Sequence, residues 1–112
     1  MNATRDVHTA TAAAYGVITT SAPDDRRVQL DAGRLVQRIH LRATAAGIAL
    51  HHMNQITERI DREAAAGAAA TFAPRFAALL PAGARPLLAF RVGHPVRVGR
   101  PTPRRSLAMV TR

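Results

Sequence analysis

The chain of 112 residues has no cysteine, no tryptophan and no lysine, and it contains no long hydrophobic run. Without cysteine, disulfide bonds, thiolate metal sites and a cysteine nucleophile are excluded. Nothing approaches the ~20 consecutive apolar residues of a membrane span, and the polar start over residues 1–6 lacks the pattern of a secretory signal. We therefore expect a cytoplasmic protein that does not span a membrane.

Aromatic residues are also scarce, since they make up 4% of a chain that is 47% hydrophobic. One tyrosine and three phenylalanines are the only aromatic side chains, and much of the other apolar content is alanine. A single domain of this length is expected to bury roughly two-thirds of its unfolded surface. Because the core is small and rich in alanine, we expect marginal stability or a partner subunit.

Acidic residues are few and confined to the first part of the chain. All seven lie at or before Glu63, eight of the sixteen arginines follow it, and the net charge is +9. An unopposed basic segment can attract nucleic acid, an anionic membrane, an acidic partner or a phosphorylated cofactor, or it can be an ordinary solvated surface. Its aromatics, Phe72, Phe76 and Phe90, stand in apolar settings and no nucleic-acid-binding motif accompanies them. The sequence therefore disfavours nucleic acid.

The first half of the chain predicts a strand followed by a long helix. Tyr15–Thr20 is rich in β-branched residues and nearly continuous in its apolar pattern, which indicates an interior strand, and a turn is expected at residues 21–25. A helix is expected over Asp31–Ala46, with Asp31 as its N-cap and Gly47 in the left-handed conformation after its end. One face of this helix is expected to be an apolar stripe made by Leu35, Val36, Ile39, Leu41, Ala43 and Ala46. The other face is expected to be a solvated ridge made by Arg34, Arg38 and Arg42.

The middle of the chain predicts a short strand and two further helices. Ile48–Met53 is a candidate extended segment, and Thr57 is expected to cap an alanine-rich helix that runs to about Ala70. Pro74 fits the first turn of a short helix, because its missing N–H has no partner in that turn. The apolar side of this short helix consists of Phe72, Phe76, Leu79 and Leu80.

The last part of the chain predicts a strand over Pro86–Val92 and then an extended arm over residues 96–112, stiffened by prolines at 101 and 103. Residues 1–12 are small and polar, and we expect them to be flexible. The whole pattern is typical of one α+β domain with a small sheet of about three strands packed with helices. Such a thin sheet leaves unpaired edges that favour a neighbouring chain.

Three motifs occur in an order that resembles the C-terminal half of the FMN-dependent nitroreductase family, in particular its actinobacterial NAD(P)H nitroreductase branch. They are the helix from Asp31-Ala32-Gly33-Arg34-Leu35-Val36-Gln37-Arg38 to Ala43-Thr44-Ala45-Ala46-Gly47-Ile48, the segment His52-Met53-Asn54-Gln55, and Leu87-Leu88-Ala89-Phe90-Arg91-Val92-Gly93-His94-Pro95 with Pro101-Thr102-Pro103-Arg104-Arg105. The resemblance spans about residues 14–107. The first half of the family domain, with its Arg-Arg-Ser-type phosphate-binding motif, has no counterpart here.

The resemblance implies that Arg104 and Arg105 bind the FMN phosphate, that Asn54 and Gln55 lie near the flavin ring, and that Tyr15–Thr20 is a central strand of the sheet. It implies hydride transfer from NAD(P)H through FMN to a nitroaromatic or quinone-type acceptor, with no catalytic side chain needed because the flavin carries the hydride. It also implies a homo-oligomer, or a companion chain that supplies the missing half of this truncated domain.

Other interpretations of the same residues stay open. Arg104 and Arg105 can be ordinary tail charges, and Asn54 and Gln55 can form a polar turn before a helix. The adjacent histidines at 51 and 52 lack the ligand spacing of a metal site, and we expect no metal. The alternative functions are a small basic binding protein that contacts nucleic acid or an acidic partner, and a non-catalytic remnant of the family domain.

Overall fold

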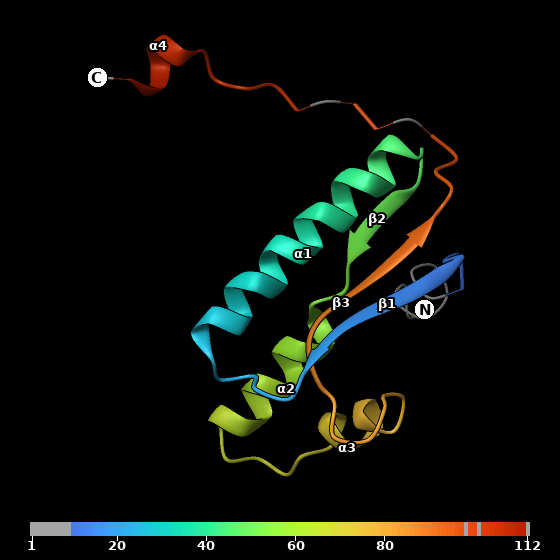
Figure 1. The fold of residues 1–112 in the computed structure, drawn as a ribbon, viewed down its shortest axis with the longest axis vertical. Helices are drawn as coiled ribbons and strands as arrows, with labels where there is room; N and C mark the ends of the chain where they lie inside the picture. Colours follow the sequence, from blue (N-terminus) through green and yellow to red (C-terminus); the bar gives the residue numbers. More distant parts are fainter. Residues whose placement is uncertain (1–9, 98, 101, 112) are drawn as a thin grey trace.

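The computed structural model describes residues 10–97, 99–100 and 102–111, and these residues form a small α+β domain (Figure 1). Their strands are β1 (Ala14–Thr20), β2 (Ala49–His52) and β3 (Arg85–Gly93). Their helices are α1 (Arg26–Ala45), α2 (Gln55–Ala65), α3 (Phe72–Ala77) and α4 (Leu107–Val110). The α+β class and the sheet of about three strands are confirmed. The predicted flexible segment 1–12 falls largely on residues 1–9, which lie outside the described residues.

The sheet is antiparallel with the strand order β1-β3-β2. The strands over residues 15–20 and 87–92 are neighbours in this sheet, because Ala14 pairs with Val92 and Ile18 with Leu88. The prediction that Tyr15–Thr20 is a central strand is wrong, since within the described residues β1 lies at the edge and β3 in the middle. The apolar run of β1 is short, because Gly16 interrupts it and Thr19 and Thr20 end it, so it does not require cover on both sides.

Phe90 fills the space that Gly16 leaves on the neighbouring strand. These two residues are directly paired across β1 and β3. A Cβ atom placed on Gly16 would lie 2.3 Å from Cζ and 2.5 Å from Cε2 of the Phe90 ring. The aromatic ring therefore lies directly over the glycine backbone. In this pairing the ring covers the backbone that a side chain at position 16 would otherwise cover.

α1 begins earlier than the sequence predicted. Its N-cap is Asp25, whose carboxylate accepts hydrogen bonds from the backbone N–H groups of Arg27 (2.8 Å) and Val28 (3.3 Å). The prediction of Asp31 as the cap is wrong, because Asp31 lies inside the helix, where its side chain pairs with Arg34 at 3.5 Å. The turn that was correctly expected at residues 21–25 thus also contains the cap.

The predicted end of α1 is confirmed. Gly47 has a φ of +69°, which glycine adopts without steric cost. Its N–H donates to the carbonyl of Thr44 at 3.1 Å, and the N–H of Ile48 donates to the carbonyl of Ala43 at 2.8 Å. This double hydrogen bond closes the helix as a Schellman motif and directs the chain into β2.

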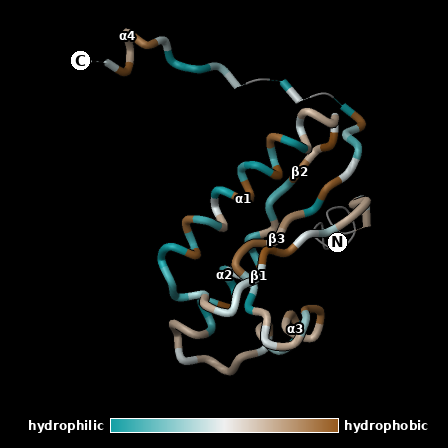
Figure 2. The backbone as a smooth tube through the Cα atoms, in the orientation of Figure 1, coloured by the Kyte–Doolittle hydropathy of each residue, from teal (hydrophilic) through white to brown (hydrophobic). Residues whose placement is uncertain are grey.

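The hydrophobic core is very small. Among the described residues, Ala32 and Val36 of α1 and Ala89 of β3 are buried hydrophobic residues, whereas Leu35 and Leu41, expected in the apolar stripe, are 47% and 61% exposed. The stripe prediction was correct for Val36 and wrong for these two leucines, because the narrow sheet contacts only one side of the helix. Figure 2 shows the resulting mixture of hydrophobic and hydrophilic segments along α1.

The accessible surface of the chain is correspondingly large. It measures 9354 Å², against roughly 6,000 Å² for a compact monomer of this mass. An unfolded chain of this mass exposes roughly 17,400 Å². The folded chain still exposes about half of that area, so the prediction that two-thirds of it is buried is wrong. The radius of gyration, 16.9 Å, also exceeds the roughly 13 Å of a compact domain. The fold therefore leaves much of its surface exposed, and the exposed side chains include large hydrophobic ones such as Leu30 and Leu79.

α2 differs from its predicted range at both ends. It begins at Gln55, and the hydroxyl of Thr57 donates to the backbone carbonyl of Asn54 at 2.9 Å rather than capping the helix. It ends at Ala65, because Gly67 takes a φ of +61°. The expected continuation to Ala70 is therefore wrong, and alanine propensity did not outweigh the glycine. The short helix expected around Pro74 is confirmed as α3.

Candidate functional site

The segment that carries Arg104 and Arg105 lies outside the core. Figure 1 shows the chain leaving the end of β3 and running past the end of α1 to α4. Every described residue from His94 onward is exposed, and only Leu107–Val110 is helical. No ion pair joins Arg104 or Arg105 to another described residue. The two adjacent guanidinium groups are therefore available to an anion. Of the two prolines expected to stiffen the arm, the one at position 101 lies outside the described residues.

Asn54 and Gln55 form the junction between β2 and α2. The backbone carbonyl of Asn54 accepts hydrogen bonds from the N–H of Glu58 and the hydroxyl of Thr57, both at 2.9 Å. Its side-chain Oδ1 is buried and has no hydrogen-bond partner among the described residues. Gln55 is exposed as the first residue of the helix. The junction thus presents one polar atom that can still accept a hydrogen bond.

The structure does not bring the arginine pair and the Asn54–Gln55 junction together within one chain. The N–H of Met53 donates to the carbonyl of Ala89 at 2.8 Å, which fixes the junction beside the middle of β3. The arm leaves β3 beyond Gly93, which pairs with Ala49 at the opposite end of β2. A flavin site made from all four predicted residues therefore does not fit into a single copy of the chain.

One groove runs along the last part of α1, and we call it the α1 groove. Its volume is about 670 Å³. It is lined by Arg38, Ile39, Arg42, Ala43, Ala45, Ala46, Ile48 and Val92. The arginine ridge predicted on α1 is confirmed, because Arg34, Arg38 and Arg42 are all exposed. Two of its members therefore flank a mainly apolar depression.

A second groove, of about 440 Å³, lies at the end of β3 on the opposite side of the sheet from the His52 side chain. Arg91 lines it and donates from Nε to Nδ1 of His51 and from a terminal nitrogen to the hydroxyl of Thr11, both at 3.3 Å. Tyr15 and His51 are the cross-strand neighbours of Arg91. Sequence reasoning missed this cluster, because only the strand pairing aligns these three residues.

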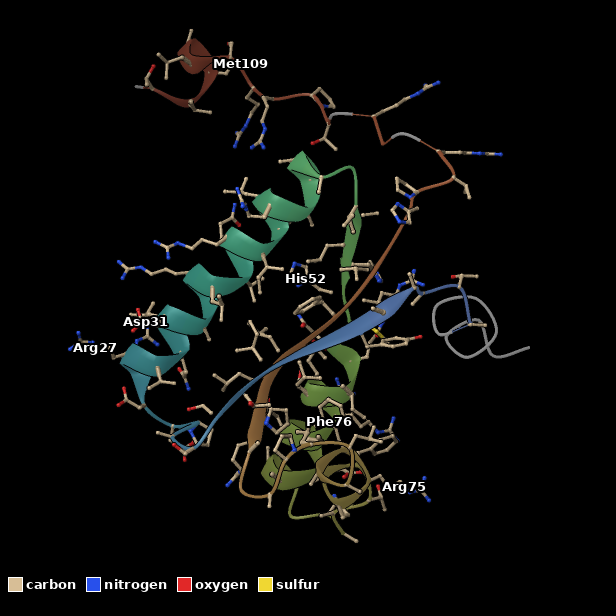
Figure 3. The ribbon with its side chains drawn as sticks, turned by 45° about the vertical axis from the view of Figure 1, so that its right-hand side comes forward. Arg27, Asp31, His52, Arg75, Phe76 and Met109 are labelled. Atoms are coloured by element: carbon tan, nitrogen blue, oxygen red, sulfur yellow. The ribbon has the colours of Figure 1, made fainter. Side chains whose placement is uncertain are left out.

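The adjacent histidines 51 and 52 point to opposite faces of the sheet, as alternate strand residues do. Figure 3 shows His52 between α1 and the sheet, and its ring meets that of His40 edge to face at 6.2 Å. No group of three or more metal-ligating side chains occurs in the ranges that the structure describes. The histidines therefore act as separate packing and hydrogen-bonding groups.

Glu63 is the centre of a structural hydrogen-bond cluster that the sequence did not reveal. Its carboxylate accepts hydrogen bonds from the Thr71 hydroxyl and from the backbone N–H groups of Thr71 (3.0 Å) and Phe72 (3.2 Å). The bond from the Thr71 hydroxyl contributes most to lowering the pKa of Glu63, and these N–H groups and Arg59 contribute further. Arg59 also lies 4.9 Å from the centre of the Phe72 ring. The cluster fastens α3 to α2 and has no apparent ligand.

Comparisons of the chain with protein-family models, with curated proteins and with solved structures find no match. Within the described ranges, none of the helices has the length and apolar character needed to cross a membrane.

Proposed function

We propose that this chain is the flavin-binding part of a nitroreductase-type oxidoreductase and that it acts together with a second chain. Bound FMN would supply hydride transfer from NAD(P)H to a nitroaromatic or quinone-type acceptor. The observation that carries the proposal is the arm, which presents the adjacent Arg104 and Arg105 to solvent without a carboxylate partner among the described residues. Planar guanidinium groups donate paired hydrogen bonds to phosphate oxygens.

A second chain is part of this proposal because the candidate residues of one copy do not converge. The arm of one copy would hold the phosphate, and the Asn54–Gln55 junction of another copy, or of a companion chain, would face the ring. The Oδ1 of Asn54 has no hydrogen-bond partner among the described residues, but it is buried, so only a ligand that inserts into the junction could donate an N–H to it. The large hydrophobic side chains left exposed support association. Use of NAD(P)H would place the activity in the cytoplasm.

The proposal is tested by titrating FMN with the whole chain and following quenching of flavin fluorescence. Replacing Arg104 and Arg105 together with alanine should weaken binding by about 2–4 kcal/mol, roughly 30- to 700-fold. The matched control replaces Arg26 and Arg27, which are also adjacent and exposed, and it should change the affinity little. Absence of binding by the parent chain, or equal losses in both double variants, would contradict the proposal.

A second candidate function is a basic binding protein with an acidic partner. The observation that favours it is the α1 ridge, where Arg38 and Arg42 are exposed and have no ion pair with a described residue. Binding of nucleic acid to such a surface would weaken steeply as the salt concentration rises. A filter-binding titration at several salt concentrations separates this function from flavin binding.

A further inference from the structure

The floor of the α1 groove is apolar and incompletely buried. Ile39 and Ala43 come from α1, Ile48 comes from the turn that follows the helix, and Val92 comes from β3. All four are only half-buried. The Schellman turn at Gly47 places Ile48 beside the end of the helix, so the floor continues from α1 onto the sheet. Apolar side chains from three segments therefore form one continuous surface that remains open to solvent.

The rim of the groove is positively charged. Arg38 and Arg42 are one helical turn apart, so their Cβ atoms are about 6 Å from each other on the same side of α1. The lining contains no aspartate or glutamate. Asp31, the acidic residue of α1, pairs with Arg34 instead. The two rim guanidinium groups therefore face solvent without a compensating carboxylate from the lining.

The charge of the arm argues against α4 of a second copy as the occupant of the groove. The exposed apolar side chains that a copy could offer include Leu107, Met109 and Val110 of α4. Figure 3 shows Met109 at the far end of the arm, away from the sheet. These residues closely follow Arg104 and Arg105, so docking them would bring further positive charges to the basic rim. Like charges placed together across an interface oppose association.

We propose that the α1 groove binds an acidic amphipathic segment of a partner chain. Apolar side chains of that segment would cover Ile39, Ala43, Ile48 and Val92. Carboxylates spaced one helical turn apart would pair with Arg38 and Arg42, and partial burial against the apolar floor would strengthen these pairs relative to exposed ones. This inference rests on the second candidate function, a basic protein with an acidic partner, and names the surface and the kind of segment bound; it does not depend on flavin binding.

The test uses the whole chain and a designed, fluorescein-labelled helical peptide with leucines on one face and glutamates four residues apart beside them. Fluorescence anisotropy should show binding of this peptide, whereas a peptide with lysines in place of the glutamates should not bind. Replacing Arg38 and Arg42 with glutamate should weaken binding of the acidic peptide roughly tenfold or more. The same variant should gain affinity for the lysine peptide.

The matched control is the double variant Arg27→Glu and Arg34→Glu, which lowers the net charge equally but alters arginines outside the groove. It should retain binding, and circular dichroism checks that both variants keep the helix. Equal losses in the two variants would show diffuse attraction and overturn the proposal, as would lack of binding by the parent chain. Dimerisation of the parent chain that requires Arg38 and Arg42 would assign the groove to a second copy and also overturn it.

Discussion

Replacing Gly16 with alanine should destabilise the fold, although glycine to alanine in a strand is ordinarily favourable. Alanine reduces the conformational freedom of the unfolded chain and thereby contributes about 0.4–1 kcal/mol of stability. At Gly16, however, the new Cβ would lie 2.3 Å from Cζ of Phe90. Carbon atoms in contact are about 3.5–4.0 Å apart, so the ring must move by more than about 1 Å.

The clash should outweigh the gain from the unfolded state. Overpacking of this kind costs about 1–3 kcal/mol, so the net loss of unfolding free energy should be about 0.5–2 kcal/mol. The control is Gly93→Ala, because a Cβ at Gly93 meets its nearest atom, the backbone N of Ala13, at an ordinary 3.6 Å. Urea unfolding followed by far-UV circular dichroism measures both variants, and only Gly16→Ala should lower the midpoint.

A double-mutant cycle isolates the ring as the cause. Leucine lacks the Cε and Cζ atoms that lie closest to Gly16, so Gly16→Ala in a Phe90→Leu background should be neutral or stabilising. The coupling between the two substitutions should be about 1–3 kcal/mol, in the range found for residues in contact. If Gly16→Ala is equally harmful with leucine at position 90, the packing explanation is refuted.

Three further predictions concern the helices. Asp25→Ala should cost about 0.5–2 kcal/mol in urea unfolding because it removes the α1 cap, whereas Asp24→Ala should cost little, and equal losses would contradict the cap assignment. Glu63→Gln should lower the urea midpoint at neutral pH. Because the pKa of Glu63 is lowered in the folded state, its contribution is present above the unfolded pKa and is lost as pH falls through the folded pKa, so a difference that persists in strong acid would count against it. Gly47→Ala should cost about 1 kcal/mol because of its positive φ, whereas Gly33→Ala, with open space at its Cβ, should stabilise α1 by up to about 1 kcal/mol; a neutral Gly47→Ala would argue against this strain.

The preferences of residues close together in the sequence were enough to predict those helices and strands whose ends depend on neighbouring residues. The Gly47 end of α1, the strand at 15–20 and the Pro74 helix follow from backbone preferences that act within a few residues. The start of α1 was missed because Asp25 and Asp31 are equally good caps by residue type. Only the turn that precedes Asp25 selects it, by placing its carboxylate against the free N–H groups.

Long-range features were beyond sequence reasoning. The position of β1 at the edge and the alignment of Tyr15, Arg91 and His51 depend on strand pairing between segments far apart in the chain. The contact between Glu63 and Thr71 depends on how the loop between α2 and α3 folds back. The roles of Arg104 and Arg105 remain a proposal, because an exposed arm carries no internal contact that fixes what it binds.

The central position of β3 also determines when the sheet can form during protein synthesis. In the described part of the chain, β1 and β2 pair with β3 and not with each other, although both precede it. No strand pairing is available to the nascent chain until residues 85–93 have been made, and closing the intervening loops then costs entropy before any sheet contact forms. Throughout this interval β1, which has no charged residue, is exposed in the cell as an unpaired hydrophobic segment. A chaperone, or a neighbouring nascent chain, therefore meets this strand before its own partner does.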